Sequence, residues 1–320
     1  MSVADPLPQA GEGVLARVAV ALAVLLALAV PPLLHALGLD FYVSMGARIV
    51  VAAIAATSLN LVLGYGGMVS FGHAAFVGLG AYATGILVSE GVAGIGWHLL
   101  ATLAVAGLAA LVIGAISLRT RGVYFIMITL AFAQMLFYLA NSIKGWGGDE
   151  GLNIRTRSAL FGLDLKDGTT FYYVALAVLG ATLAALRRFA GSRAGRAVVA
   201  MRDDVERAEA LGFPTYRLRL AVFVAAGMLG GVAGLLTINQ QGYVSPGLLH
   251  WTQSGTLMVM VILGGVGSLW GGVLGAAALI LLQEGLAAFT PYWEFWTGWV
   301  LLAVVLFARR GLAGWIGRAA

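Results

Sequence analysis

Residues 220–283 read LAVFVAAGMLGGVAGLLTINQQGYVSPGLLHWTQSGTLMVMVILGGVGSLWGGVLGAAALILLQ, without a single Asp, Glu, Lys or Arg. A helix needs about 20 apolar residues to cross a bilayer. This uncharged stretch is therefore long enough for more than one membrane-spanning helix. Working outward along the chain, further uncharged stretches cover residues 18–39, 49–89, 91–118, 122–143 and 168–186.

The composition excludes several classes of protein. Hydrophobic residues make up 61% of the 320 residues and charged residues only 10%, whereas soluble domains carry about 25% charged residues. Barrel strands alternate over segments of about 10 residues, and no such pattern occurs here. The absence of Cys excludes disulfides, zinc–thiolate sites and thiol nucleophiles. We predict an all-α, polytopic transmembrane helical bundle that forms a single integral domain over residues 1–320.

Charges and glycine or proline clusters divide the apolar stretches into about ten expected spans, with eight or nine as the alternative counts. The first is interpreted as a retained helix and not as a cleaved signal peptide, because Asp5 and Glu12 precede it. The expected spans cover residues 14–37, 42–63, 68–88, 96–117, 123–141, 170–188, 219–239, 252–268, 271–289 and 295–310.

Basic residues favour the cytoplasmic side of membrane proteins. With an even number of spans, most arginines fall on one side, which predicts that both termini are cytoplasmic. The same orientation predicts an extracytoplasmic loop at residues 141–170 and a cytoplasmic loop at 189–219. Because the basic residues gather in these membrane-edge loops, the net charge of +5 gives no indication of nucleic-acid binding. The expected cytoplasmic arginines are Arg17, Arg119, Arg121, those from Arg187 to Arg219, Arg309, Arg310 and Arg318.

Glycines at helical spacing predict close helix packing, because small residues let helices approach in lipid. Gly78 and the pair Gly267 and Gly271 belong to such rows. Two clusters also interrupt apolar stretches, and they comprise Gly64, Gly66, Gly67, Gly264, Gly265 and Gly267. They are equally explained as turns between spans or as unwound segments along a transport path.

The cytoplasmic loop holds an amphipathic pattern. Val198, Met201, Val205 and Ala208 recur at steps of three and four, which predicts one helix from about residue 196 to 211. Gly212 stands where a helix-ending glycine is expected. Since four acidic residues lie among the basic ones, we expect the apolar stripe to sit in a protein groove and not on anionic lipid.

Polar side chains at membrane depth tend to face an interior or a cavity. The candidates for a translocation path are Asn60, Ser70, His73, Gln134 and Gln253. For His73, a hydrogen bond at a helix start is the alternative role, and it is favoured over a substrate contact. The scattered His residues form neither a catalytic set nor a metal site, so we expect no catalytic residues, no metal and no cofactor.

Specific motifs resemble a known family. Glu206-Arg207-Ala208-x3-Gly212 is similar to the EAA-x3-G coupling loop of ABC importer permeases. The surrounding loop resembles the LivM-type branch of the branched-chain amino acid permease family. The segments 58–83, 148–152 and 261–277 are also similar to that family, in colinear order over roughly residues 45 to 290.

The resemblance implies a permease subunit of an ATP-driven importer in the bacterial inner membrane. It implies two ABC ATPase subunits, a second related permease and an extracytoplasmic solute-binding protein as partners. Neither Lys144 nor Lys166 is followed by Ser or Thr, so the chain holds no P-loop of its own and ATP hydrolysis is expected on separate subunits. The expected ATPase-coupling residues are Arg196, Val198, Met201, Val205, Glu206, Ala208 and Gly212.

The expected substrates are branched-chain or related amino acids. Urea, short amides and aromatic amino acids remain alternatives within the same class. An ion-coupled secondary transporter is the alternative from another class, but such coupling usually leaves acidic residues deep in a span. Of the acidic residues in this sequence, only Glu284 lies well inside an expected span.

Overall fold

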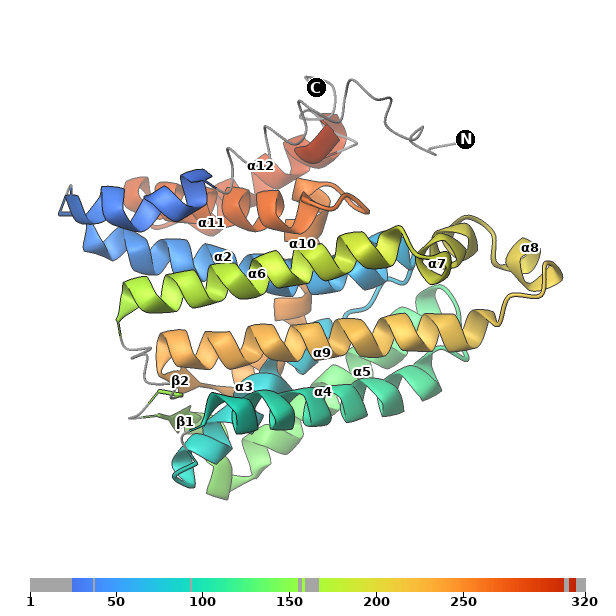
Figure 1. Ribbon diagram of the computed structural model, residues 1–320, viewed down its shortest axis with the longest axis horizontal. Helices are drawn as coiled ribbons and strands as arrows, with labels where there is room; N and C mark the ends of the chain where they lie inside the picture. Colours follow the sequence, from blue (N-terminus) through green and yellow to red (C-terminus); the bar gives the residue numbers. More distant parts are fainter. Residues whose placement is uncertain are drawn as a thin grey trace.

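The computed structural model describes residues 25–36, 38–92, 94–154, 157–158, 167–307 and 311–314. The N-terminal part of the first expected span, both chain termini and Arg155 and Lys166 of the outer loop lie outside the described residues. Most of the described chain is helical, and the long helices lie roughly side by side along the length of the molecule (Figure 1). A small two-stranded sheet lies at one end, and two short helices extend from the other end (Figure 1).

The helices follow the expected apolar segments closely. A helix over Leu25–Ala36 precedes the labelled elements. The helices and strands are α2 (Asp40–Asn60), η1 (Leu61–Tyr65), α3 (His73–Ser89), α4 (Ile95–Ser117), α5 (Val123–Ser142), η2 (Lys144–Trp146), η3 (Gly148–Glu150), β1 (Leu152–Asn153), α6 (Gly168–Ala190), α7 (Arg193–Asp203), α8 (Val205–Ala210), α9 (Thr215–Gln241), β2 (Tyr243–Val244), η4 (Pro246–Leu249), α10 (Trp251–Gly264), α11 (Gly271–Phe289) and α12 (Trp293–Phe307).

Six of these helical segments, within the described part of the chain, are long and apolar enough to cross a membrane. The structure thus has the architecture of a helical, multi-span membrane protein, while the count of about ten crossings and the sides of the termini stay predictions. The six are Asp40–Tyr65, Ile95–Ser117, Val123–Ser142, Gly168–Ala190, Thr215–Gln241 and Gly271–Phe289.

Close packing around α9 depends on glycine. A Cβ atom on Gly234 of α9 would lie 1.9 Å from the carbonyl oxygen of Val77 on α3, and one on Gly80 would lie 2.1 Å from the carbonyl oxygen of Gly231. These distances leave no room for a side chain, so the backbones of α3 and α9 are in direct contact.

The helices α10 and α11 pack in the same way. A Cβ atom on Gly275 would lie 1.6 Å from Met260 O, and one on Gly264 would lie 1.7 Å from Gly271 O. Gly78 instead packs against Leu249 of η4, whose Cδ2 would lie 2.6 Å from an added Cβ. The glycine rows seen in the sequence thus lie at helix contacts.

Two helices are too short to span a bilayer alone, because α3 has 17 residues and α10 has 14. The first residue of α3, His73, is fully buried beside Gly230, about midway along α9. The first turns of α3 and α10 are in contact, since the amide of Ala74 donates to Ser254 Oγ at 2.9 Å. The segments that precede both helices therefore enter the interior of the bundle.

Each glycine cluster lies where a helix ends, close to α7. Gly64 lies in the π-helix η1, which continues α2, and Gly67 follows with a φ of +65°. Gly265 and Gly267, with φ of +115° and +79°, form the turn between α10 and α11. The second cluster is thus a turn, whereas the first continues into a non-helical segment that includes the buried Ser70.

The single helix expected at residues 196–211 is wrong, because the chain breaks it into α7 and α8. Asp204 has an extended backbone (φ −156°, ψ 106°), and its side chain accepts a hydrogen bond from the amide of Arg207 at 3.0 Å. Aspartate is a preferred N-cap residue, so α8 begins anew after it. Around the break, Arg202 lies near Asp203 and Arg207 near Asp204.

Candidate functional site: a helical segment at the helix breaks

The helices α7 and α8 and the residues around them form the first candidate site. Ser192 caps α7, because its Oγ accepts a hydrogen bond from the amide of Gly195 at 3.0 Å. Gly212 ends α8 with a φ of +83°, and the amide of Phe213 returns to Ala208 O at 3.2 Å. This segment protrudes from the end of the bundle opposite the sheet (Figure 1).

The apolar stripe of this segment faces the protein's own bundle. Val198 and Met201 are each 1% exposed and Ala208 is buried, and they pack in one cluster with Leu61 and Val62 of η1. The expectation that these side chains lie in a groove of another protein is therefore wrong for the buried members, because α2–η1 and α9 already cover them. Val205 is half-buried.

Other members of the expected coupling set face solvent. Arg196, Glu206 and Gly212 are exposed, and Arg196 Nη1 donates to Gly191 O at 2.9 Å within its own segment. Two large apolar side chains that the sequence analysis did not select are exposed beside them, Leu211 (71%) and Phe213 (41%). These two apolar residues flank the helix-ending Gly212, and this placement was the signal in the sequence for a contact surface.

Glu209 fixes the position of α8. Its Oε1 lies 3.1 Å from Arg121 Nη2, in the turn between α4 and α5, and accepts a hydrogen bond from Thr215 Oγ1 at 2.9 Å. Both contacts are partly exposed, so each contributes little alone. Together they join α8 to two turns of the bundle.

The five candidates for a translocation path do not gather in one place. Asn60, Ser70 and His73 are fully buried and serve the helix breaks. Asn60 bonds the turn after α10, with Nδ2 donating to Ser268 O at 2.7 Å, and Ser70 Oγ accepts from the amide of Gly72 at 3.3 Å.

His73 has the hydrogen-bonded role given as the alternative. Its Nε2 lies 2.8 Å from Ser58 Oγ, while the Ser58 hydroxyl donates to Ala55 O at 2.7 Å. With the Ser58 hydroxyl donating to Ala55 O, the proton between Ser58 Oγ and the ring belongs to Nε2. Nδ1 is buried and has no hydrogen-bond partner among the described residues.

Gln134 and Gln253 lie elsewhere. Gln253 is exposed in the first turn of α10, next to the exposed Thr252. Gln134 is half-buried on α5, and its Oε1 has no hydrogen-bond partner among the described residues. Both lie on helices with exposed apolar side chains, including Met135, Tyr138 and Trp251. Of the two, Gln253 is exposed in the described chain, whereas the Oε1 of Gln134 is buried.

A second buried polar cluster, at the end of the bundle that holds the sheet, was not selected from the sequence. His98 on α4 contacts Ser158 Oγ at 2.7 Å through Nδ1 and Val92 O at 2.8 Å through Nε2. The amide of Ser158 donates to Asn239 Oδ1 at 2.8 Å. A histidine within an uncharged span was the only signal, and it did not reveal its partners far along the chain.

The two-stranded sheet joins distant loops. Leu152 pairs with Val244 and Asn153 with Tyr243, in antiparallel register. Gly151 has a φ of +76°, and a Cβ there would lie 2.3 Å from Val244 O. The motif at residues 148–152 thus has a structural role in holding the outer loop against the segment after α9.

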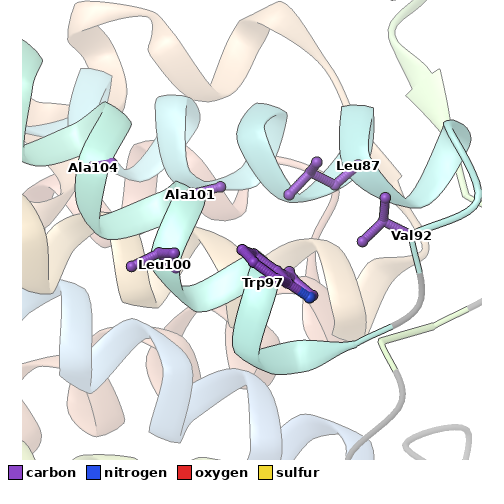
Figure 2. A pocket seen from close by; sticks show the side chains of 6 residues that line it. All are labelled: Leu87, Val92, Trp97, Leu100, Ala101 and Ala104. Carbon is purple, nitrogen blue, oxygen red and sulfur yellow. The ribbon is translucent and has the colours of Figure 1, made fainter.

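One surface hollow in the described chain is apolar. It lies between the end of α3 and the start of α4, with a volume of about 410 Å³, and the indole of Trp97 covers one side of it (Figure 2). No group of three or more His, Cys, Asp or Glu residues that could hold a metal occurs within the described residues. The hollow has no side chain suited to catalysis, since it is lined by Leu87, Val92, Trp97, Leu100, Ala101 and Ala104.

Comparison with known proteins yields one family. The chain matches the family described as "Branched-chain amino acid transport system / permease component" over residues 41–308. It is 29% identical over 280 residues to the high-affinity branched-chain amino acid transport system permease protein LivM of Salmonella typhimurium, covering 79% of this chain. The LivM protein of Escherichia coli is 28% identical over the same length.

A second group of relatives is named for a different substrate. The autoinducer 2 import system permease protein LsrC of an Enterobacter species is 29% identical over 253 residues, covering 73% of this chain and 69% of that protein. The match to both LivM proteins spans 65% of their length.

Proposed function

This chain belongs to the branched-chain amino acid transport permease family, and from that premise we propose that it is a membrane-spanning subunit of an ATP-driven importer. The members of that family are transport permeases and not enzymes. In this proposal the chain forms the path for the solute, and separate subunits hydrolyse ATP.

The observation that carries the proposal is the build of the α7–α8 segment. Its inner face is anchored in the bundle through Val198 and Met201, while Leu211 and Phe213 are exposed on its outer side. Large exposed apolar groups beside charged ones are typical of a protein contact surface. We assign this surface to one ATP-binding subunit, with Arg196, Glu206 and Gly212 at its edge.

Four kinds of partner complete the assembly. Two ATP-binding subunits supply energy, a second related permease pairs with this chain, and an extracytoplasmic binding protein delivers the solute. We place the complex in the bacterial inner membrane, with about ten crossings in this subunit and both termini in the cytoplasm. The loop at 141–170 then faces the binding protein, and the loop at 189–219 faces the ATP-binding subunits.

We propose that the surface formed by α5 and α10, which carry Gln134 and Gln253, lines one side of the translocation path. Polar side chains at membrane depth rarely face lipid, and Thr252 and Gln253 are exposed in this chain. We infer that the second permease covers this surface and that the solute passes between the two chains. Asn60, Ser70 and His73 support the path from inside the bundle without lining it.

Branched-chain or related amino acids are the proposed substrates. Urea, short amides and aromatic amino acids are the alternatives, and the LsrC relatives add autoinducer 2. An ion-coupled secondary transporter is disfavoured, because Glu284 is partly exposed near Arg48, with the charged atoms 4.0 Å apart, and not buried in a coupling site.

The test begins with purification of the tagged protein from its own cells in mild detergent and identification of the chains that accompany it. We expect two P-loop ATPases and a second permease. The purified complex is then placed in proteoliposomes with its binding protein, and uptake of labelled leucine is measured with and without ATP. Competition by phenylalanine, urea and autoinducer 2 separates the substrates, and uptake by the lone chain without ATP would contradict the proposal.

A further inference from the structure

Arg202, in the last turn of α7, reaches from the cytoplasmic segment into the helix breaks. Its Nη1 donates a hydrogen bond to Gly64 O at 2.7 Å. Its stem covers Gly67, where an added Cβ would lie 2.6 Å from Arg202 Cγ. A Cβ on Gly267, in the other glycine cluster, would lie 3.2 Å from Arg202 Nη1. One side chain therefore touches both breaks.

The two breaks are also joined directly to each other. Asn60 Oδ1 accepts a hydrogen bond from the amide of Gly267 at 2.9 Å, and its Nδ2 donates to Ser268 O. A Cβ on Gly64 would lie 2.4 Å from Gly267 N, so the backbones are in contact. The end of α2–η1 and the turn between α10 and α11 therefore have to move as one unit.

The electrostatics favour an arginine at this place. Gly64 lies in the last turn of η1, and the carbonyl end of a helix carries partial negative charge that attracts a cation. A planar guanidinium can donate to Gly64 O and lie flat against Gly267, whereas a lysine ammonium acts as a point charge. The Arg202 side chain is 32% exposed, and its hydrogen bond to Gly64 O is partly buried.

The other end of the connection is the exposed part of the same segment. Met201, the neighbour of Arg202, is buried in the cluster that includes η1, which fixes α7 against the break. The chain then changes direction at Asp204, and α8 leads to the exposed Leu211 and Phe213. A force applied to α8 therefore reaches the bundle next to Arg202.

We propose that Arg202 is the positioning residue that transmits movement of α7–α8 to both helix breaks at once. The inference rests on the proposed function, because it takes the ATP-binding subunits as the source of the movement. Through Gly64 and Gly67 the movement reaches the start of α3, and through Gly267 it reaches α10 and α11. The first turns of α3 and α10, in contact through Ala74 and Ser254, are thereby driven together.

The experiment compares solute uptake with ATP hydrolysis in proteoliposomes that hold the full complex. In R202A we expect uptake to fall roughly tenfold or more, as loss of one charge-assisted hydrogen bond predicts. ATP hydrolysis should be largely retained, because Arg202 contacts the helix breaks and not the exposed surface of α8. The ratio of solute moved to ATP hydrolysed therefore drops. R188A removes an exposed arginine at the end of α6 and should leave the ratio unchanged.

G67A provides a second route to the same result without removing the charge. Its methyl group would displace the Arg202 stem, so we expect the same loss of the uptake-to-hydrolysis ratio even if R202A is not recovered. An unchanged ratio in the recovered variants, or equal losses of uptake and hydrolysis, overturns the role of Arg202. Absence of ATP-dependent uptake in the unaltered complex would instead overturn the proposed function.

Discussion

The side-chain amide of Asn60 accepts the backbone N–H of Gly267 at 2.9 Å across a sequence separation of 207 residues. The same amide donates to Ser268 O at 2.7 Å. A single buried side chain thus supplies a donor and an acceptor to a turn that has no regular helix to satisfy it. This bond ties the end of α2 to the turn between α10 and α11.

Replacement of Asn60 by Ala should destabilise the protein. The substitution leaves the Gly267 amide and the Ser268 carbonyl without their partner, and each unsatisfied buried group costs about 1–3 kcal/mol. We expect a lower midpoint of thermal unfolding in detergent, with unfolding monitored by tryptophan fluorescence. N141A, at the exposed end of α5, is the matched control. Equal midpoints for the two variants would contradict a structural role for this bond.

The contact between α3 and α9 predicts a contrast between two glycines. In G234A the new methyl would lie 1.9 Å from Val77 O, so the helices must separate. Overpacking of this kind typically costs about 1–3 kcal/mol. G180A meets nothing within 4 Å and should be neutral or slightly stabilising, because alanine favours helix. The yield of monodisperse protein and its unfolding midpoint test the contrast.

One substitution in the buried apolar stripe and one on the exposed surface beside it test folding and partner binding separately. M201D places a charge where the side chain is 1% exposed, and we expect loss of folded protein because an unpaired buried charge is strongly unfavourable. L211D alters a side chain that is 71% exposed, so the protein should fold but retain less of the ATP-binding subunits. The level of each variant in the membrane measures folding, and co-purification of the ATP-binding subunits measures partner binding. Normal co-purification of L211D would contradict the assignment of the contact surface to this side chain.

The start of α8 depends on its cap. D204A removes the acceptor for the Arg207 amide, and loss of such a cap typically costs about 0.5–2 kcal/mol. We expect faster hydrogen exchange of the amides from Arg207 to Leu211. D203A, one residue earlier, has an exposed side chain and caps nothing in the described structure. Identical exchange in the two variants would contradict separate α7 and α8 helices.

The start of α6 predicts a pH dependence. Hydrogen bonds from the Thr170 hydroxyl and the Thr170 amide hold the pKa of Asp167 below its ordinary value. The resulting stabilisation is present above the ordinary pKa and is lost as pH falls through the lowered one. In T170V the hydroxyl is absent, so the loss should begin at higher pH. Unfolding midpoints measured from about pH 5 downward test this, and coincident curves would contradict it.

The sequence by itself determined the class of protein and the positions of its helices. Runs without charge, such as residues 220–283, have no stable alternative to helices in a membrane, since every backbone polar group must be satisfied within the segment. Small residues at helical spacing likewise predicted contacts, and Gly78 and Gly271 lie at them. The family resemblance rests on motifs in short segments, which can be recognised without knowing which residues they contact in the folded protein.

Only the tertiary structure decided which surface each residue faces. Periodicity showed that Val198, Met201 and Ala208 share a stripe, but burial by η1 in the same chain depends on a contact between distant segments. The joining of both glycine clusters by Asn60 and Arg202 is decided in the same way. Hydrogen bonds between residues more than a hundred positions apart leave no local pattern, because the spacing of residues along one helix reports only that helix's own faces.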